Sequence, residues 1–411
     1  PSFYTYLLLF SQIYLIFYRK LVNNKKYTYN NENSRTENIK KVISALITGE
    51  TFSRADIAKK FNLNKATISD ITDKLIKDNL IKEIGFGYSK PTGGRKPILL
   101  QINKRAGIIF SFEFQYDKYR FMATYFDGEL IVKTETDTKI NKNNIINIVR
   151  DTVENFLANP EYSRYKVFGI GIAVHGIVKN NKVVFTPYYD IYEADIASEI
   201  EKVLDIPVIL ENEANACAIF ESTVNNIYQN LISINISSGI GSGIVLNSHL
   251  YKGIRGDAGE AGHTILYPGG KKCGCGKYGC FEQYCSKQAL LKEYALIRHK
   301  KNPSLQELKQ DYLNKNTDVL NLIAGYKQNL IIGLGNIITL FSPEILILKS
   351  DIFIELPDIF VELKNNLKQY NENVKITLTD WKEYSTLFGA VISVLQSHFD
   401  ITSFNSYMRI L

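Results

Sequence analysis

Cysteine is scarce in this sequence, because only five of its 411 residues are cysteines. An odd number of cysteines without a cleavable signal sequence argues against the disulfide framework of a small secreted protein. Three of the five, Cys273, Cys275 and Cys280, fall close together in a glycine-rich stretch. This spacing favours metal binding in a reducing cytoplasm, whereas Cys217 is most simply a small buried apolar residue.

The N-terminus lacks an apolar run long enough to span a membrane. The stretch Phe3–Tyr18 is apolar and aromatic, but it is shorter than the roughly 20 residues that a spanning helix needs, and no small-residue cleavage site accompanies it. A weak membrane anchor, a helix packed on the body and an extension outside the functional protein are three open interpretations. We favour an extension for residues 1–33, because organised patterning begins only near Ser34. We therefore expect no stable membrane association.

Positive charge is concentrated at the front of the chain. Residues 34–105 contain 15 lysines and arginines against 7 aspartates and glutamates, a net charge of +8, and residues 1–33 contribute a further +3. The formal net charge of the whole chain is +7, so the remaining residues are net negative. A local basic excess of this kind is typical of a segment that meets a polyanion such as DNA, although a solvated basic face would also explain it.

Residues 34–105 carry the pattern of a small DNA-binding fold. Apolar residues at helical spacing predict a first helix over 36–48. Ser53 and Asp56 have the spacing of a capping box that opens a second helix, and Asn64 is placed to cap a third. Helix, helix-turn-helix and two-stranded ribbon is the plan of a winged helix-turn-helix domain. The two strand-like runs, on either side of a glycine-rich basic loop, are Leu80–Gly85 and Pro97–Ile102.

In such a domain the third helix enters the major groove, with its N-terminal residues nearest the bases. Hydroxyls there can hydrogen-bond base edges, an alanine can touch a thymine methyl group, and a lysine can hold a phosphate. The loop between the strands offers cations to the adjacent minor groove or backbone. Each position alone could be an ordinary exposed one, so the prediction depends on the set. The candidate DNA-binding residues are Lys65, Ala66, Thr67, Ser69, Asp70, Arg95 and Lys96.

From residue 106 onward, strand-like and helical segments alternate in two halves. This predicts a two-lobed α/β body over 106–411 with a cleft between the lobes. We expect a small lobe of about 106–210 plus a C-terminal helix over 385–398, and a large lobe of about 211–389. The expected strands are Ile108–Phe114, Tyr119–Phe126, Leu130–Thr136, Val167–Val174, Pro207–Glu211, Leu231–Ile236, Ile240–Asn247, Ile345–Leu348 and Lys375–Thr379.

One histidine and three cysteines predict a metal site. His263, Cys273, Cys275 and Cys280 would complete the tetrahedral ligand shell of a structural zinc ion. The glycines between the cysteines allow a tight loop, and three nearby lysines would offset the thiolate charge. Cys285 is a competing ligand, but it is expected to start the next helix. A histidine bound to zinc through one nitrogen can offer the other nitrogen to a ligand hydroxyl.

These residues resemble the signature of the ROK family (repressors, open reading frames and sugar kinases). The resemblance rests on Glu260-x-x-His263 followed by Cys-x-Cys-Gly-x-x-Gly-Cys-x-Glu, and on the wing sequence Gly93–Pro97 of the repressor branch. It covers Ser34 to the C-terminus and implies an actin-like, ribonuclease-H-like body with sugar in its cleft. The residues that it places against sugar hydroxyls are Asn212, Glu213, Glu260, His263 and Glu282. For the first two, a helix N-terminus is the alternative explanation.

Three departures from the family's kinases argue against an enzyme. The glycine-rich phosphate loop after the first strand is replaced by Ser111–Tyr116, which contains no glycine. Bulky side chains there would keep backbone amides from cradling phosphate. Lys349-Ser350 stands where a Gly-Gly pair is usual, and Glu213 stands at the position of the catalytic aspartate that accepts the proton of the attacking sugar hydroxyl. The Ser238–Gly243 segment keeps a second phosphate-like loop, for which a tight glycine turn is an equally good explanation.

The resemblance therefore implies a repressor that releases operator DNA on binding a monosaccharide, with a sugar kinase using ATP as the alternative. Two recognition helices on a palindromic operator imply a homodimer. The Glu211–Asn215 motif is similar to that of the xylose-responsive members of the family. The longer Glu213 side chain would fill the space of a hexose's sixth carbon, which favours a pentose. His175-Gly176 and Pro187–Tyr189 depart from the family near the cleft and weaken this assignment.

Overall fold

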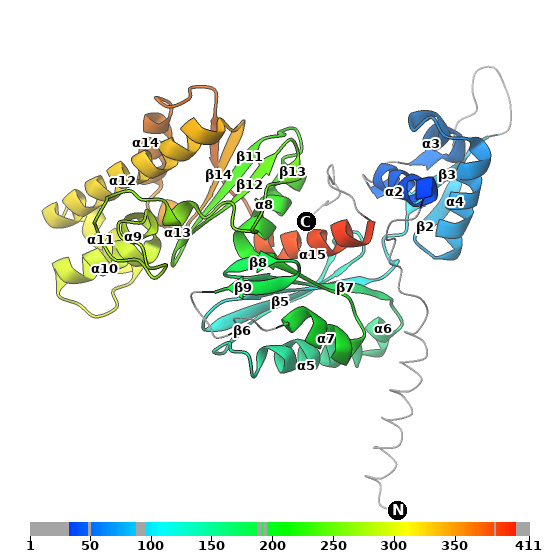
Figure 1. Ribbon diagram of the computed structural model, residues 1–411, viewed down its shortest axis with the longest axis horizontal. Coiled ribbons are helices and arrows are strands. Elements are labelled where there is room, and N and C mark those ends of the chain that lie inside the picture. The colour runs from blue at the N-terminus through cyan, green and yellow to red at the C-terminus, as the bar shows by residue number, and fades with distance from the viewer. Residues whose placement is uncertain are drawn as a thin grey trace, which may run out of the picture.

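The computed structural model of the protein describes residues 33–47, 51–87, 96–186, 191, 195–381 and 384–399. An N-terminal unit lies beside a body of two lobes, and the helix α15 (Tyr384–Phe399) runs between them (Figure 1). The proposals for residues 1–32, for Arg95 and for Pro187–Tyr189 lie outside the described residues. In the part of the chain that is described, no helix combines the length and hydropathy needed to cross a membrane.

Three helices and a small antiparallel sheet make up the N-terminal unit. The helices are α2 (Asn33–Ile47), α3 (Arg54–Lys60) and α4 (Lys65–Lys77), and the strands are β1 (Phe52–Ser53), β2 (Ile81–Phe86) and β3 (Ile98–Ile102), in the order β1-β3-β2. The expected caps are present: Ser53 and Asp56 form a capping box, and the Asn64 side chain accepts from the Ala66 N–H at 2.9 Å. These caps satisfy backbone donors at the helix starts, which defines the turn between α3 and α4.

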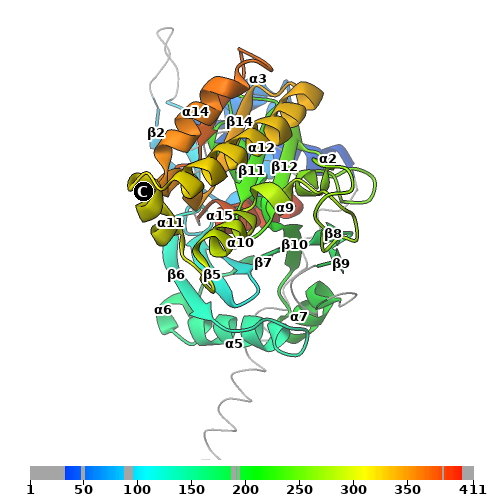
Figure 2. The same cartoon turned by 90° about the vertical axis from the view of Figure 1, so that its left-hand side faces the viewer.

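The first lobe is built on a five-stranded mixed sheet in the order β10-β7-β4-β5-β6. Strands β4, β5 and β6 form an antiparallel meander, and β7 and β10 join it in parallel. Helices α5 and α7 cover one face (Figure 2), and α15 packs on the other. The elements are β4 (Ile108–Phe114), β5 (Lys118–Tyr125), β6 (Leu130–Asp137), α5 (Ile145–Leu157), α6 (Pro160–Ser163), β7 (Val167–Val174), α7 (Ile196–Leu204) and β10 (Val208–Asn212).

The second lobe repeats this plan with the sheet order β13-β12-β11-β14-β15. Here β11, β12 and β13 form the meander, and β14 and β15 are parallel to β11. Helices α12 and α14 lie across its outer face (Figure 2). The elements are β11 (Leu231–Ile236), β12 (Ile240–Leu246), β13 (His249–Leu250), α9 (Glu282–Cys285), α10 (Lys287–Arg298), α11 (Leu305–Leu313), α12 (Thr317–Phe341), β14 (Ile345–Lys349), α13 (Asp351–Glu355), α14 (Pro357–Leu367) and β15 (Lys375–Leu378).

Two helices, packed against each other, join the lobes. Helix α8 (Glu213–Val224) packs on the inner face of the second sheet, α15 packs on the inner face of the first, and the two helices pack on each other. Small side chains at this junction, Ala173, Ala216 and Ala390, form their own buried cluster, which lets the backbones approach closely. Any ligand that moves the start of α8 therefore acts at the joint between the lobes.

The expected strands of the body are all present, with ends that differ by at most one residue. The structure adds a hairpin that the sequence did not predict, β8 (Ile177–Lys179) and β9 (Lys182–Phe185), directly after β7. After residue 282 it has four helices, α9 to α12, before β14, and it adds α13 and α14 after that strand. The strands of the hairpin and α13 carry too few residues for periodicity to reveal them.

Candidate functional site

The expected sugar-binding residues come from three separate segments. Asn212 and Glu213 stand where β10 ends and α8 begins. Glu260 directly precedes a 3-10 turn (Ala261–His263), of which His263 is the last residue, and Glu282 is the first residue of α9. The side chain of His263 lies 3.7 Å from Glu260 and 3.6 Å from Glu282. The negative charges of Glu213 and Glu282 are both close enough to Glu260 to raise its pKa. The fold therefore brings four of the five residues into one cluster of acceptors.

Asn212 has a different position from the other four. Its side-chain oxygen accepts from the Ala214 and Asn215 backbone N–H groups at 2.9 and 3.0 Å, which makes it the N-cap of α8. Its amide nitrogen donates to the Gly176 carbonyl at 2.7 Å. A side-chain amide has two lone pairs and two N–H donors, so these bonds leave one donor for a ligand. Asn212 thus holds the end of β7 against the start of α8.

The carboxylate of Glu213 is buried and held from both lobes. One oxygen accepts from the Asn235 side-chain amide on β11 at 2.7 Å, and the other lies 3.6 Å from Nδ1 of His175, which follows β7. Only 7% of the Glu213 side chain is exposed. Sequence reasoning missed Asn235, and its only signal was a lone asparagine inside an apolar strand. His175 was noticed only as a departure from the family pattern.

Glu260 is the residue of the cluster whose acidity the fold changes most. Burial, followed by the charges of Glu213 and Glu282, raises the pKa of Glu260 to about 7. A carboxyl group with this pKa is present near neutral pH in both protonation states, so it can donate as well as accept a hydrogen bond. Paired donors and acceptors of this kind suit the vicinal hydroxyls of a polyol.

The histidine and the three cysteines converge as the sequence predicts. The possible ligand atoms of His263, Cys273, Cys275 and Cys280 all lie within 4.8 Å of one another. Two close pairs are Cys273 Sγ with His263 Nδ1, and Cys275 Sγ with Cys280 Sγ, each 3.6 Å apart. Thiolates bound tetrahedrally at the usual Zn–S length lie about 3.8 Å apart. The four residues therefore have a spacing that fits one tetrahedral metal ion.

Local geometry explains why this loop is rich in glycine. Gly279 has a φ of +81°, and a Cβ at this position would fall within 1.6 Å of the Tyr267 carbonyl oxygen. Only glycine permits this crossing of the two arms of the loop.

The acidity of the thiols in this loop depends on burial and hydrogen bonds. Burial raises the pKa of the Cys275 thiol, but hydrogen bonds led by the Lys277 backbone N–H outweigh burial and lower this pKa overall. A lowered pKa favours the thiolate at Cys275, which is the form that binds metal. Burial raises the pKa of the Cys273 and Cys280 thiols, so a metal ion would displace their protons on binding.

Cys285 is not part of the metal cluster. It is the last residue of α9 rather than the first residue of the next helix, and it is fully buried in the apolar core of the second lobe. Burial holds the pKa of its thiol well above the usual range. These features separate Cys285 from the four clustered residues, so the competition considered from the sequence is not supported by the fold.

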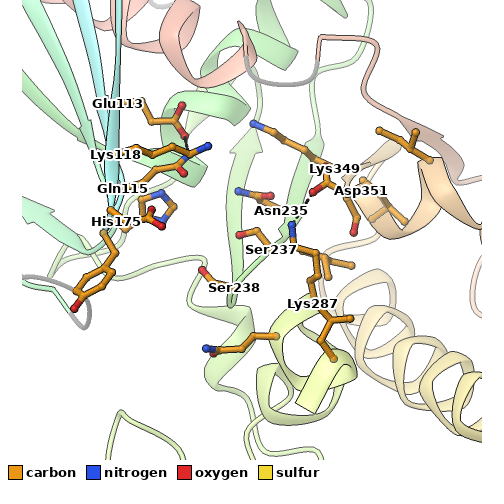
Figure 3. A pocket seen from close by; sticks show the side chains of 18 of the residues that line it. Glu113, Gln115, Lys118, His175, Asn235, Ser237, Ser238, Lys287, Lys349 and Asp351 are labelled. Carbon is orange, nitrogen blue, oxygen red and sulfur yellow. Dashed lines mark hydrogen bonds and ion pairs between the residues drawn. The ribbon is translucent and has the colours of Figure 1, made fainter. Parts of the chain in front are cut away.

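A cleft of about 1000 Å³ separates the two lobes, and it is lined in part by His175 and Asn235, the two neighbours of Glu213. Figure 3 shows Glu113, Gln115, Lys118 and His175 on the wall formed by the first lobe, facing Asn235 and Lys349 on the second. The sequence predicted a cleft, but it did not predict that so large a volume would persist without the glycine loop of the kinases.

The wall that replaces this glycine loop presents a carboxylate side chain, Glu113, that is paired with an arginine. Strand β4 continues through Phe114, and the Gln115 backbone N–H donates to the Lys118 carbonyl at 2.9 Å, so the chain turns directly into β5. The Glu113 carboxylate pairs with Arg120 at 3.0 Å. Burial alone would raise the pKa of Glu113, but Lys349, Arg120 and His175 together lower it. An ionised carboxylate can only accept hydrogen bonds, so Glu113 offers a phosphate group none of the donors that a glycine loop supplies.

The second phosphate-like loop has a structural explanation. A Cβ on Gly243 would come within 2.4 Å of the Ala218 side chain, so this glycine lets β12 pack closely on α8. At the turn itself, the Ser237 backbone N–H donates to the Gly239 carbonyl, and the Lys287 N–H donates to the Ser237 carbonyl. One of these bonds closes the turn, and the other joins it to the start of α10. Both favour the tight-turn interpretation.

In the N-terminal unit, Lys65, Ala66 and Asp70 are exposed at the start of α4, and Thr67 and Ser69 are partly buried. Lys96, directly before β3, is also exposed.

Sequence reasoning missed Arg54 on α3. Its side chain joins three elements, because it bonds Thr72 and Asp73 on α4 and Glu83 on β2. The three hydrogen bonds of Arg54 measure 2.9, 2.7 and 3.0 Å. Thr72 and Asp73 therefore position α4, which leaves its first two turns to face outward.

Two lobes of repeated topology around a cleft define an actin-like α/β body. The family model "ROK family" matches residues 118–396, and the chain belongs to the ROK family. It is 36% identical over 319 residues to the xylose repressor of Bacillus spizizenii, a match that covers 76% of this chain and 82% of that protein. It is 32% identical over 362 residues to the xylose repressor of Lactiplantibacillus pentosus, covering 86% and 91%.

Among solved structures, the fold is similar to that of a ROK family transcriptional regulator described as a homologue of the E. coli MLC protein. The TM-score is 0.75 at 24% identity, and the match covers 88% of this chain and 97% of the other. At this identity the likeness shows the fold.

Proposed function

We propose that this protein is a transcriptional repressor that releases operator DNA when a monosaccharide of the xylose type binds its cleft. The observation that carries the proposal is the contrast between the acceptor cluster and the adjoining cleft. The acceptor cluster around Glu213, Glu260 and Glu282 is assembled, whereas the phosphate cradle of a kinase is replaced by the ionised Glu113. The relatives named xylose repressors support both the repressor function and the sugar.

Residues 34–105 are assigned as a winged helix-turn-helix domain, and residues 106–411 as the sugar-binding body. Helix α4 would enter the major groove through the exposed side of its first two turns, and the loop between β2 and β3 would act as the wing. The proposed DNA contacts are Lys65, Ala66, Thr67, Ser69, Asp70, Arg95 and Lys96. Two such domains in a homodimer would read the two halves of a palindromic operator.

His263, Cys273, Cys275 and Cys280 are assigned as the ligands of a structural zinc ion. When bound, zinc would tie the arms of the loop together and supply folding free energy. With Nδ1 of His263 near Cys273, the opposite nitrogen Nε2 lies 3.7 Å from Glu260, on the side of the sugar cluster. The histidine would therefore orient its second nitrogen toward a sugar hydroxyl.

Contacts within the fold support a route from sugar to DNA. Glu213 is the first residue of α8, and α8 packs on α15 at the joint between the lobes. One apolar cluster then contains Leu46 and Leu75 of the N-terminal unit together with Leu395 of α15. If sugar and DNA bind best to different arrangements of the two lobes, binding of either ligand lowers the affinity for the other by the same factor.

The test is a gel shift with the full chain and the DNA upstream of its own gene. We expect a retarded complex without sugar and its loss on adding xylose, with arabinose, glucose and N-acetylglucosamine as comparison sugars. Coupling free energies are typically worth about 5- to 150-fold in affinity. A complex that no sugar in the panel weakens would contradict the proposal, and so would a complex that forms only with sugar, because the coupling would then have the opposite sign.

A sugar kinase is the alternative function, and coupled ADP release measures it directly. We expect no ADP release above background from the pure protein with MgATP and either xylose or glucose, because no glycine loop is present to hold phosphate and the Glu113 carboxylate stands in its place. A ROK glucokinase assayed in parallel serves as the positive control. Sustained, sugar-dependent ADP release would reject the repressor-only function.

A further inference from the structure

We infer that Lys252 is a positioning residue of the sugar site, because its ion pair with Glu211 fastens a strap of the second lobe onto the first lobe. The strap is the segment Tyr251–Gly259, which leads from β13 to Glu260. The inference rests on the proposed sugar-binding function. It adds a residue that lies outside the acceptor cluster, the metal ligands and the family signature.

Both ends of the strap are anchored on β12 of the second lobe. At the start, the Tyr251 backbone N–H donates to the Ile244 carbonyl at 2.8 Å. At the end, the Ser242 hydroxyl donates to the Gly259 carbonyl. Glu260 of the acceptor cluster directly follows this last residue, so the position of the strap affects the position of Glu260.

The strap contacts the first lobe at two points. Nζ of Lys252 lies 2.5 Å from a carboxylate oxygen of Glu211, which is near the end of β10. Farther along, Gly256 has a φ of +81°, and a Cβ at this position would lie 2.6 Å from the Val178 carbonyl oxygen of β8. Only glycine lets the strap approach β8 this closely. The strap therefore bridges the two lobes.

Glu211 is the point at which the strap meets the start of α8. Its second carboxylate oxygen accepts from the Asn212 backbone N–H at 3.0 Å and from the Asn215 side-chain amide at 3.2 Å. Glu213, two residues further on, is the first residue of α8 and a member of the acceptor cluster. One carboxylate thus connects the segment that carries Glu213 with the segment that carries Glu260.

The burial of Glu211 makes its cation important. Only 4% of the Glu211 side chain is exposed, against 46% of the Lys252 side chain. Exposed ion pairs contribute little to stability, whereas a buried carboxylate that loses its cation has to find another partner or move toward water. Such a movement would release the strap and displace the start of α8 at the same time.

Limited trypsin digestion of the full chain, read by mass spectrometry, measures without any sugar whether the strap is fastened. Arg255 lies within the strap with 79% of its side chain exposed, so cleavage after Arg255 reports local opening. For Lys252→Met we expect this cleavage to be roughly tenfold faster than in the wild type. Lys252→Arg keeps the cation and should restore the wild-type rate.

Lys300→Met is the matched control. The pair of Lys300 with Glu307 is also 2.5 Å long, and 50% of the lysine side chain is exposed, but its glutamate partner is 42% exposed. Loss of this cation leaves no buried carboxylate behind. The control should therefore keep the wild-type rate of cleavage after Arg255.

Calorimetric titration with xylose tests the effect on the sugar site. Lys252→Met should weaken xylose binding at least about fivefold, whereas Lys252→Arg and Lys300→Met should bind xylose like the wild type. Coupling between two sites is reciprocal. Saturating xylose should therefore slow the cleavage after Arg255 in the Lys252→Met chain.

The double variant Glu211→Gln with Lys252→Met distinguishes positioning from a general loss of stability. It removes both charges, so no unpaired carboxylate stays buried, and the melting temperature should recover toward that of the wild type. The strap still lacks its ion pair, so xylose binding should stay as weak as in Lys252→Met. Recovery of xylose affinity in the double variant overturns the inference.

Two results for the single variant also overturn it: cleavage after Arg255 at the wild-type rate in Lys252→Met, or faster cleavage with unchanged xylose affinity. If xylose binds the wild type and releases the operator while either result is found, the repressor function stands and the role of Lys252 is rejected. If no sugar of the panel binds the wild type, the proposed function is rejected together with the assignment of Lys252 to a sugar site.

Discussion

Replacing Thr67 and Ser69 together by alanine should weaken operator binding about 10- to 100-fold at fixed salt concentration. The two hydroxyls lie in the first two turns of α4, where the proposed recognition helix meets base edges. Alanine has a higher helix propensity than threonine or serine, so the helix should remain intact. Fluorescence anisotropy with labelled operator measures the loss, and circular dichroism verifies the fold.

Variants of two lysines on α4 distinguish the contribution of charge to DNA binding from that of contacts to the bases. Lys65→Ala, at the start of α4, should weaken binding to all DNA sequences alike and reduce the slope of log K against log[salt] by about 1. Lys77→Ala removes the same charge from the exposed end of α4, about 18 Å along the helix axis, and should change neither quantity. Wild-type affinity in the Thr67/Ser69 double variant would show that α4 is not the reading helix.

Replacing Cys280 by serine should remove the metal, with the largest effect on stability of any single change considered. Cys280 is fully buried, its sulfur lies 3.6 Å from that of Cys275, and a serine hydroxyl is a poor zinc ligand. We expect zinc content to fall from one equivalent to near zero. Because structural zinc contributes folding free energy directly, the melting temperature should fall by about 10 °C or more.

The loss of metal should also weaken the sugar response, because His263 and Glu282 would lose their fixed positions. Operator binding without sugar should persist, since the N-terminal unit packs on α15 of the first lobe, whereas the metal cluster lies in the second. Cys285→Ser is the matched control: this cysteine is also buried but lies outside the cluster, so it should keep full zinc content. Full zinc content in Cys280→Ser would refute the ligand assignment.

The contrast between Glu113 and the acceptor cluster also explains how one fold can serve kinases and regulators. A kinase needs backbone amides that cradle phosphate, whereas a regulator needs only a ligand-dependent difference between two lobe arrangements. Here the cleft remains, but Arg120 and Lys349 keep a carboxylate ionised where phosphate would sit. The volume that persists between the lobes leaves room for them to move relative to each other.

Much of this molecule could be predicted from the sequence, because the deciding patterns are local. Alternation and helical spacing of apolar residues identified the strands of both sheets, and the Ser53/Asp56 and Asn64 caps located the starts of α3 and α4. The metal cluster was predicted for the same reason, since three of its four ligands lie in one short glycine-rich loop. Departures from the family's motifs identified the region around Glu113.

Other features were decided only by the tertiary structure, because they depend on which side chains two packed sheets bring together. Asn212 was expected to bind sugar, yet its amide is mostly engaged in capping α8 and holding Gly176. The pairing of Glu213 with Asn235 and His175 joins residues of different lobes, and no spacing along the chain encodes it. The exclusion of Cys285 from the metal cluster likewise follows from the direction in which α9 is buried. Local sequence determines elements and loops, whereas the packing of α8 and α15 between the lobes determines the site.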